Sequence, residues 1–232
     1  DIESKIDFVP DVLFHLGEYS RTSASFQEPE KIWEYNVEGT FRVLEFCRKK
    51  NVRKLLYAGS STKLADGGDG RNQSPYAWSK AMNTELVQRY HDWFGVSFVI
   101  VYFYNVYGGR EIDSSAYSTL IGIFKRLTKE KKPLTVCEPG TQYRSFTHVD
   151  DVVRGILSAA EKGSGDGYCL GPREMYTITE VAELFGGEIV MIPHKLGDRK
   201  TVAIDLTKTE EELGWKARIR LEEHIAEFLN SL

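Results

Sequence analysis

Val96-Ser97-Phe98-Val99-Ile100-Val101-Tyr102 is a nearly continuous run of apolar residues. Such a run is typical of a strand that is covered on both faces, as the strands of a parallel sheet are. It follows a helical pattern over residues 75–94, and shorter apolar runs at 12–16 and 55–58 flank another helical pattern over 29–50. This alternation of strands and helices predicts an α/β fold with a largely parallel sheet.

The remaining segments are less regular. Residues 60–74 include three glycines and are expected to form a loop. Thr177 and Glu180 have the spacing of a capping box at the start of a helix. Further elements are expected as helices at 118–128, 149–161 and 221–232 and as strands at 134–137 and 188–192.

The composition carries no mark of nucleic-acid or membrane binding. The 232 residues are 41% hydrophobic, and the formal net charge is −4. Lys and Arg form no dense cluster, and no apolar run approaches the roughly 20 residues that span a bilayer. We therefore expect no nucleic-acid partner and no membrane segment.

The three cysteines, Cys47, Cys137 and Cys169, are far apart and form neither a CxxC pair nor a metal-ligand spacing. The histidines are scattered over separate expected elements. We expect buried free thiols in a reducing cytoplasm, and no metal site.

Tyr76 and Lys80 are four residues apart on the helix expected at 75–94, so they share one face of it. A free tyrosine titrates near pKa ~10, and a neighbouring ammonium favours the phenolate. The pair therefore has the chemistry of a general base. Spacing alone favours an ordinary pair on a helix surface.

The context favours catalysis. The segment Gly59-Ser60-Ser61-Thr62-Lys63 leaves the carboxyl end of a buried strand, which is where open parallel sheets bind ligands. Hydroxyl groups at this place can hydrogen-bond a substrate oxygen and share its proton with Tyr76.

Several segments, in this order, resemble the extended short-chain dehydrogenase/reductases of the NAD-dependent nucleotide-sugar epimerase/dehydratase family. The matching segments are His15-Leu16-Gly17, Asn36-Val37-Glu38-Gly39-Thr40, Ser60-Ser61-Thr62, Tyr76 with Lys80, Tyr104-Asn105-Val106-Tyr107-Gly108, residues 143–151, Gly197-Asp198 and Leu213-Gly214-Trp215.

The resemblance implies a Rossmann-like, doubly wound parallel sheet with a smaller mixed α/β lobe for substrate. Residues 1–108 are expected to belong to the cofactor-binding domain. Residues 109–232 are expected to form mainly the nucleotide-sugar lobe, with some segments returning to the sheet. The glycine-rich turn of the family does not occur here, so we expect its N-terminal part to be absent from this chain.

The resemblance also implies roles for individual residues, with NAD as cofactor and a nucleotide-diphosphate sugar as substrate. The expected catalytic residues are Ser61, Lys63, Tyr76 and Lys80. The expected cofactor-binding residues are Asp1, Leu16, Gly17, Asn36, Ser60, Tyr76, Lys80 and Tyr104. The expected substrate-binding residues are Ser61, Thr62, Asn105, Arg144, Lys195 and Asp198.

Some of these residues have plain structural alternatives. Asn105 can cap a turn, Arg144 can form a surface ion pair, and Asp198 can be a turn residue beside Gly197. Lys195 stands where many relatives have arginine, and it offers a point charge instead of a planar fork.

The resemblance implies a 4,6-dehydratase acting on a GDP- or UDP-linked N-acetylglucosamine for bacterial surface glycans, by a small margin over a UDP-sugar 4-epimerase. Dehydration needs an acid/base beyond Tyr76, and no acidic residue follows Ser61 and Thr62. Lys63 is the candidate, because a desolvated lysine can titrate near neutrality. A solvent-facing Lys63 is an equally good interpretation.

Other classes also stay open. One is a non-catalytic relative that binds nucleotide sugars, and another is a ketoreductase that consumes reduced cofactor. We expect a cytoplasmic homodimer that pairs through the helices at 29–50 and 75–94. The four residues Trp33, Phe41, Trp78 and Trp93 suit either that interface or the core.

Overall fold

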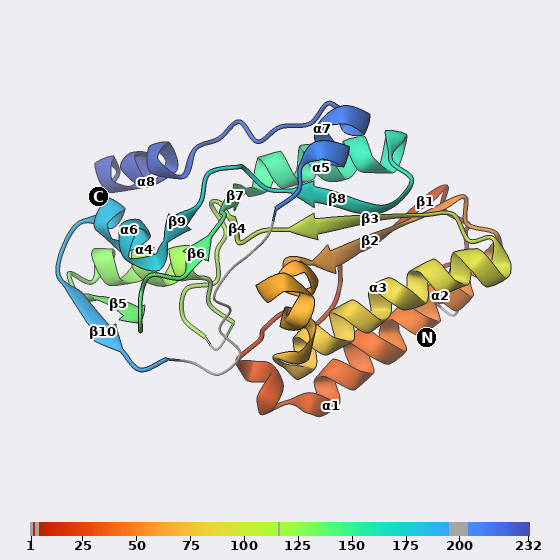
Figure 1. The fold of residues 1–232 in the computed structure, drawn as a ribbon, viewed down its shortest axis with the longest axis horizontal. Helices are drawn as coiled ribbons and strands as arrows, with labels where there is room; N and C mark the ends of the chain where they lie inside the picture. Colours follow the sequence, from red (N-terminus) through yellow and green to blue (C-terminus); the bar gives the residue numbers. More distant parts are fainter. Residues whose placement is uncertain (1, 3–4, 116, 195–203) are drawn as a thin grey trace.

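The computed structural model describes residues 2, 5–115, 117–194 and 204–232. Its central sheet has four parallel strands in the order β1 (Val12–His15), β2 (Lys54–Ser60), β3 (Phe98–Phe103) and β8 (Gly165–Leu170) (Figure 1). The predicted α/β class with a parallel sheet is confirmed.

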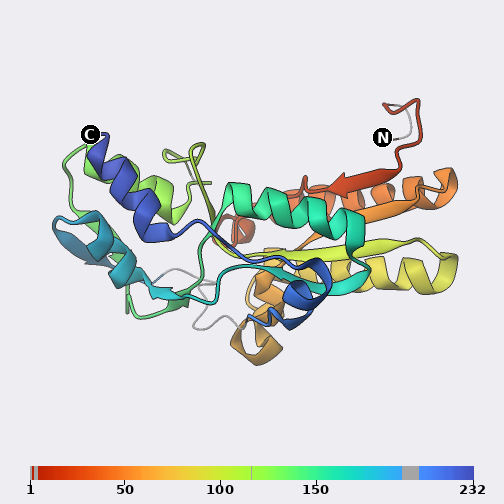
Figure 2. The ribbon, with the colours of Figure 1, turned by 90° about the horizontal axis from the view of Figure 1, so that it is seen from above.

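The two faces of the sheet are covered by different helices. Figure 1 shows α2 (Gly39–Lys50) and α3 (Pro75–Phe94) below the sheet and α5 (Val149–Lys162) with α7 (Thr207–Leu213) above it, and Figure 2 gives the view from above. Because side chains alternate along a strand, neighbouring residues of one strand enter different cores.

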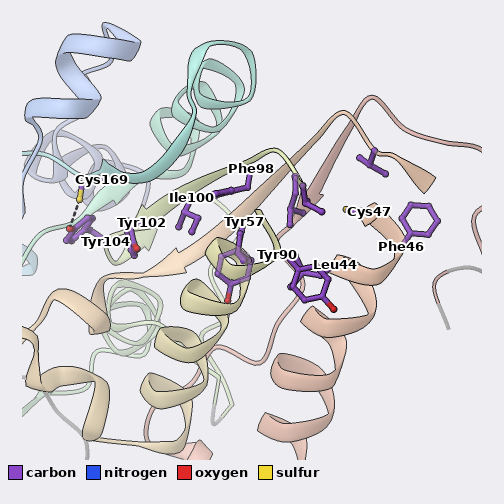
Figure 3. Close-up of a cluster of buried hydrophobic side chains, with 14 of the residues drawn as sticks. Leu44, Phe46, Cys47, Tyr57, Tyr90, Phe98, Ile100, Tyr102, Tyr104 and Cys169 are labelled. Atoms are coloured by element: carbon purple, nitrogen blue, oxygen red, sulfur yellow. Dashed lines mark hydrogen bonds between the residues drawn. The ribbon is translucent and has the colours of Figure 1, made fainter. Parts of the chain in front are cut away.

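The core on the α2 and α3 side is rich in aromatic residues (Figure 3). It includes Leu55 and Tyr57 of β2, while Leu56 between them belongs to the core under α5 and α7. All three side chains are fully buried. A strand buried on both faces explains the continuous apolar run that the sequence shows.

Helix α3 begins and ends as the sequence predicts. Pro75 occupies its first turn, and the Ser74 hydroxyl accepts a hydrogen bond of 3.0 Å from the Ala77 amide. Gly95 ends the helix with a φ of 71°, a conformation that glycine adopts without strain. These caps fix the register of Tyr76 and Lys80 relative to β2.

The predicted continuous helix over residues 29–50 is interrupted. A short α1 (Pro29–Lys31) is followed by a π-helical segment η2 (Ile32–Glu38) before α2. The Asn83 side chain of α3 donates a 2.8 Å hydrogen bond to the Asn36 carbonyl. The interruption of the helix therefore coincides with a side-chain contact from α3.

The predicted loop at residues 60–74 was wrong in its detail. It contains the short 3₁₀ segments η3 (Ser61–Leu64) and η4 (Asp66–Asn72). Gly67 and Gly68 have φ angles of 68° and 103°, which break the helical path inside η4. The segment is therefore compact, although it forms no long helix.

The second half of the chain has its own core, in which α4, α6, α8 and β5 meet. The capping box of Thr177 and Glu180 is confirmed at the start of α6. The predicted elements are present as α4 (Leu120–Lys129), β5 (Leu134–Cys137), α5, α6 (Ile178–Phe185), β10 (Ile189–Ile192) and α8 (Leu221–Asn230). The expected domain boundary between residues 108 and 109 stays a prediction.

The sequence did not predict several elements. These are β8, α7, the 3₁₀ turn η1 (Ala24–Phe26) and the short strands β4 (Val106–Tyr107), β6 (Tyr143–Arg144), β7 (Thr147–His148) and β9 (Tyr176–Thr177). Strand β8 contains Gly165 and Gly167 and only the short apolar run Tyr168-Cys169-Leu170, so its pairing with β3 is what identifies it.

The aromatic residues that were assigned to either the core or an interface are exposed. Trp33, Phe41, Trp78 and Trp93 are 59%, 48%, 41% and 60% exposed. Among the cysteines, Cys47 and Cys169 are buried, but Cys137 is only partly so, against expectation. None of the helices formed by the described residues is both long and apolar enough to cross a bilayer.

Asp151 joins α5 to the segment after α7. Its buried carboxylate accepts hydrogen bonds from the amides of Arg218 (2.7 Å) and Ile219 (2.9 Å), and it also pairs with Arg154. Burial alone would raise the pKa of Asp151, but these donors hold it below its usual value.

Replacing Asp151 by Asn should destabilise the protein by about 2–3 kcal/mol at pH 7, because hydrogen bonds to a charged acceptor are lost. A lowered pKa in the folded state means that this stabilisation is present above the ordinary carboxyl pKa and is lost as the pH falls through the folded value. Urea unfolding between pH 7 and pH 3 should therefore show that the free energies of unfolding of the parent and of Asp151→Asn converge below about pH 4. A difference that is constant over this range would contradict the assignment.

Candidate active site

A hollow of about 500 Å³ opens at the carboxyl ends of β2 and β3. It lies between the sheet and α4 of the second half of the chain. Its lining combines polar and apolar groups, as is typical of small-molecule sites. Its lining includes Ser60, Ser61, Thr62, Tyr76 and Asn105, which were predicted from the sequence.

Tyr76 stands over the end of β2. Its hydroxyl donates a 3.2 Å hydrogen bond to the Ser60 hydroxyl, which also accepts one of 2.8 Å from Thr62. Ser61, the residue expected to bind the sugar oxygen, is buried and lines the same hollow. The tyrosine and the strand-end hydroxyls therefore come together as the sequence suggested, with Ser60 bonded directly to Tyr76.

Lys80 lies one helical turn after Tyr76, deep at the side of β2. Its side chain is only 5% exposed. The ammonium donates to the Ala58 carbonyl and to the carboxylate of Glu18, and it lies 4.4 Å from the centre of the Tyr57 ring. Burial lowers the pKa of Lys80, and the Glu18 carboxylate opposes that shift. The expected ammonium is present, but its strongest partner is a carboxylate that the sequence analysis did not single out.

Glu18 follows β1, and its side chain is also only 5% exposed. Besides the Lys80 ammonium, its carboxylate accepts hydrogen bonds from Thr40 (2.8 Å), Asn83 (2.9 Å) and Tyr57 (3.1 Å). Its donors come from α2, β2 and α3, and they lie 22 to 65 residues after Glu18 in the chain. No local pattern around Glu18 reveals such a partner set. The only signal was its position directly after Gly17, in the segment expected to face the cofactor.

Lys63 points away from the hollow. Its ammonium lies 3.3 Å from a carboxylate oxygen of Asp166 and 3.3 Å from the Tyr102 hydroxyl. Tyr102 in turn donates to Asp166 at 2.7 Å. The Lys63 side chain is 23% exposed, so it is held in a partly buried ion pair at the amino end of β8. The structure does not bring Lys63 together with Tyr76 in one cavity.

Arg21 was not predicted as a site residue from the sequence. It lines the hollow near Tyr76. Its Nε donates a 2.7 Å hydrogen bond to the Tyr117 carbonyl. Burial lowers the pKa of Arg21, and the charge that Tyr76 carries as phenolate opposes this shift. A guanidinium stays protonated in proteins, so it can bind an anionic or hydroxyl group but cannot act as a base.

Asn105 and Arg144 line an adjoining hollow of about 320 Å³. The Asn105 side chain donates a 2.8 Å hydrogen bond to the Ser145 carbonyl, and its φ of 28° lies in the left-handed region. Arg144 is 5% exposed and donates 2.8 Å to the Tyr143 carbonyl. Both residues thus have structural roles and also face a cavity. The surface ion pair considered for Arg144 does not suit so buried a side chain.

Two of the residues expected to bind cofactor, Leu16 and Gly17, directly follow β1. A hollow of about 680 Å³ there is lined by His15, Gly17 and Glu18 among others. A side chain at Gly17 would meet no atom within 4 Å, so the backbone is open to a ligand. Leu16 beside it is 47% exposed.

Two other residues expected at the cofactor are engaged inside the protein. The Asn36 amide group binds the Tyr19 backbone, through an acceptor contact of 2.7 Å and a donor contact of 3.0 Å. Tyr104 is fully buried, and its hydroxyl lies 3.2 Å from the Cys169 sulfur (Figure 3). Asn36 therefore shapes the segment after β1, and Tyr104 is part of the core.

Three predicted residues, Asp1, Lys195 and Asp198, lie outside the described residues. Within the described part of the chain, no group of three His, Cys, Asp or Glu side chains is placed to hold a metal ion.

Comparison with known proteins identifies relatives of this chain. The model of the NAD dependent epimerase/dehydratase family matches residues 2–171. A putative UDP-glucose 4-epimerase of Methanocaldococcus jannaschii is 28% identical over 246 residues, which cover 99% of this chain and 80% of that protein. A probable dTDP-glucose 4,6-dehydratase of Sinorhizobium fredii is 29% identical over 245 residues, which cover 91% of this chain and 69% of that protein.

Solved structures share the fold. The crystal structure of the Thermus thermophilus UDP-glucose 4-epimerase in complex with NAD superposes with a TM-score of 0.85 and 23% identity. The match covers 95% of this chain and 77% of that one. The Rossmann-like arrangement that the sequence predicted is thereby confirmed.

Proposed function

Because the chain belongs to the NAD-dependent epimerase/dehydratase family, we propose that it interconverts C4 epimers of a UDP-linked hexose. One observation supports epimerisation over dehydration. The described residues that line the hollow beside Tyr76 include no Asp, Glu or Lys, and Arg21 is their one charged side chain. Elimination of water needs a second proton-transfer group in that hollow, whereas epimerisation needs only the base at C4.

In the proposed reaction, Tyr76 as phenolate takes the proton from the sugar 4-hydroxyl. Ser60 is bonded to Tyr76, and Ser61 lines the same hollow, so both can hold the sugar oxygen during the transfer. The protonated Lys80 favours the phenolate by its charge. The 4-keto sugar then turns over within the hollow, and Tyr76 returns the proton to the oxygen when the opposite face is reduced.

The residues present fit NAD at the end of β1. An ammonium has three donors, and among the described residues Lys80 uses two, toward Ala58 and Glu18. The third can serve a ribose hydroxyl. The open backbone at Gly17 can lie against the rest of the cofactor. When bound, NAD would accept the hydride from C4 and, in its reduced form, would return it to the opposite face of the 4-keto sugar.

A 4,6-dehydratase is the second candidate, and the Sinorhizobium fredii relative favours it. In that case Lys63 would have to leave Asp166 and enter the hollow. That movement would break the partly buried ion pair with Asp166 and the contact with the Tyr102 hydroxyl, and both losses disfavour it.

The test is the reaction product of the full-length protein supplied with NAD. UDP-glucose and UDP-N-acetylglucosamine are the first substrates to try, with their GDP- and dTDP-linked counterparts as comparisons. We expect an isobaric product that is inverted at C4, seen by NMR. A product lighter by one molecule of water, seen by mass spectrometry, would overturn the epimerase assignment.

Replacing Lys63 by Ala distinguishes the two reactions further. If Lys63 only pairs with Asp166, the variant should epimerise with a kcat within about threefold of the parent, which corresponds to less than 1 kcal/mol. Water loss that occurs in the parent and stops in Lys63→Ala would instead identify Lys63 as the acid/base. The matched control is Asp166→Asn, which removes the same ion pair and leaves Lys63 in place.

A homodimer through the two long helical segments is part of the proposal. Exposed Trp33, Phe41, Trp78 and Trp93 on these helices support it, because large exposed aromatic groups are enriched at interfaces. Sedimentation of the full-length protein and of a Trp33→Glu variant tests it.

A further inference from the structure

We propose that Glu18 is a positioning residue of the active site, whose buried carboxylate holds the Lys80 ammonium in place and in its charged form. The role of Lys80 toward Tyr76 rests on the proposed function, but the bond between Glu18 and Lys80 can be tested without it.

The carboxylate of Glu18 is fixed from several sides. Thr40 of α2 donates to it at 2.8 Å, Asn83 of α3 at 2.9 Å, and Tyr57 of β2 at 3.1 and 3.2 Å to its two oxygens. Lys80 of α3 completes the set with the charged donor. Four donors from three elements leave the carboxylate little freedom, so Lys80 has one preferred position.

The electrostatics of the pair support a function beyond stability. A buried ion pair loses the hydration of both charges, and an apolar pair of the same size often stabilises a fold as well or better. The pair at Glu18 and Lys80 is almost completely buried on both sides. A charged lysine next to the catalytic tyrosine is useful only if the charge survives burial, and Glu18 supplies the compensating charge.

The other groups around Lys80 cannot replace Glu18. His15 of β1 lies 4.0 Å from Glu18, and burial lowers the pKa of His15, which leaves it neutral near pH 7. Tyr57 faces the ammonium with its ring, and burial holds its pKa well above the usual value. Tyr76, one turn before Lys80, is the group whose charge Lys80 should control. Among the described residues facing Lys80, Glu18 is therefore the group that stays negatively charged throughout the proposed catalytic cycle.

The predicted effect of Glu18→Gln follows from burial. Without the carboxylate, desolvation should lower the pKa of Lys80 by at least about one unit. Protonated Lys80 then disappears at a lower pH, so the alkaline limb of the kcat profile should move down by the same amount. At pH 9 we expect kcat to fall further, relative to pH 7, than in the parent, by up to about tenfold for each unit of the shift. KM for the nucleotide sugar should change little, because Glu18 does not line the hollow beside Tyr76.

The direct measurement is the titration of Lys80 by NMR in the full-length protein labelled with ¹³C at the lysine ε-carbon, with the signal assigned by Lys80→Arg. Glu18→Asp keeps the charge but retracts it, so its Lys80 pKa should lie between those of the parent and Glu18→Gln. If Glu18→Gln does not fold, the Lys80 pKa is measured in Glu18→Asp instead. The matched control is Glu45→Gln, which removes a carboxylate that accepts from Tyr90 (3.0 Å) and Arg48 on the far part of the helices.

Two outcomes decide the inference. A lowered Lys80 pKa in the Glu18 variants, with Glu45→Gln like the parent, supports it even if no epimerase activity is found, in which case only the proposed function fails. A Lys80 pKa within about 0.3 units of the parent in Glu18→Gln, or in Glu18→Asp where the Gln variant does not fold, overturns it. A uniform loss of kcat without a shift of the alkaline limb would likewise reduce Glu18 to a structural residue.

Discussion

Replacing Tyr76 by Phe should lower kcat by about 100- to 10,000-fold, the range that a positioned general base contributes. The hydroxyl is the group that exchanges a proton with the sugar 4-oxygen in the proposed reaction. The aromatic ring stays, so the packing of α3 over β2 should be preserved. The variant loses the hydrogen bond to Ser60, which is weak at 3.2 Å. The free energy of unfolding should therefore change by only about 1 kcal/mol.

The measurement is steady-state epimerisation of the variant beside Tyr90→Phe. Tyr90 lies on the same helix and also donates from its hydroxyl, to Glu45, but far from the hollow. Tyr90→Phe should keep full activity. Parental kcat in Tyr76→Phe would exclude the tyrosine as the base. A parent that binds nucleotide sugars without converting any would favour the non-catalytic alternative.

Replacing Lys80 by Met should have a double effect. Activity should fall at least about 100-fold, because the charge that favours the Tyr76 phenolate is gone. The folded state should also lose about 3–5 kcal/mol, because Glu18 is left as a buried carboxylate without its counter-ion. The loss of stability results from breaking the ion pair between Glu18 and Lys80 and not from the catalytic role of Lys80.

A double variant separates the two effects. Lys80→Met combined with Glu18→Gln removes both charges, so most of the lost stability should return in urea unfolding, while activity stays low. Stability that does not recover in the double variant would mean that Lys80 acts through its aliphatic packing. Recovery of activity together with stability would remove Lys80 from the catalytic mechanism.

The helix caps and the apolar runs explain why so much of the fold could be predicted. The ends of α3 are set by Ser74, Pro75 and Gly95, and these local signals need no tertiary contact. The elements that could not be predicted depend instead on tertiary contacts. The π-helical segment around Asn36 is hydrogen-bonded by Asn83 of α3, and β8 is identified by its pairing with β3. Both are interactions between residues that are far apart in the chain.

The candidate site divides in the same way. Tyr76, Ser60 and Ser61 could be predicted because a helical spacing of four and a strand end are local patterns that bring them to one place. The orientation of Lys63 could not be predicted, because a side chain at this position can reach the solvent, the hollow or Asp166. Only the placement of Asp166, about one hundred residues later in the chain, decides between them.

The sequence by itself determined the α/β class, the family resemblance and the pairing of Tyr76 with the hydroxyls after β2, because these follow from periodicity, caps and short motifs. Tertiary structure alone decided that Glu18 holds Lys80 and that Lys63 is held outside the hollow. The physical reason is that the fate of a charged side chain depends on the partners that the fold brings to it. The energy of burying a charge without a partner is large enough to select those partners.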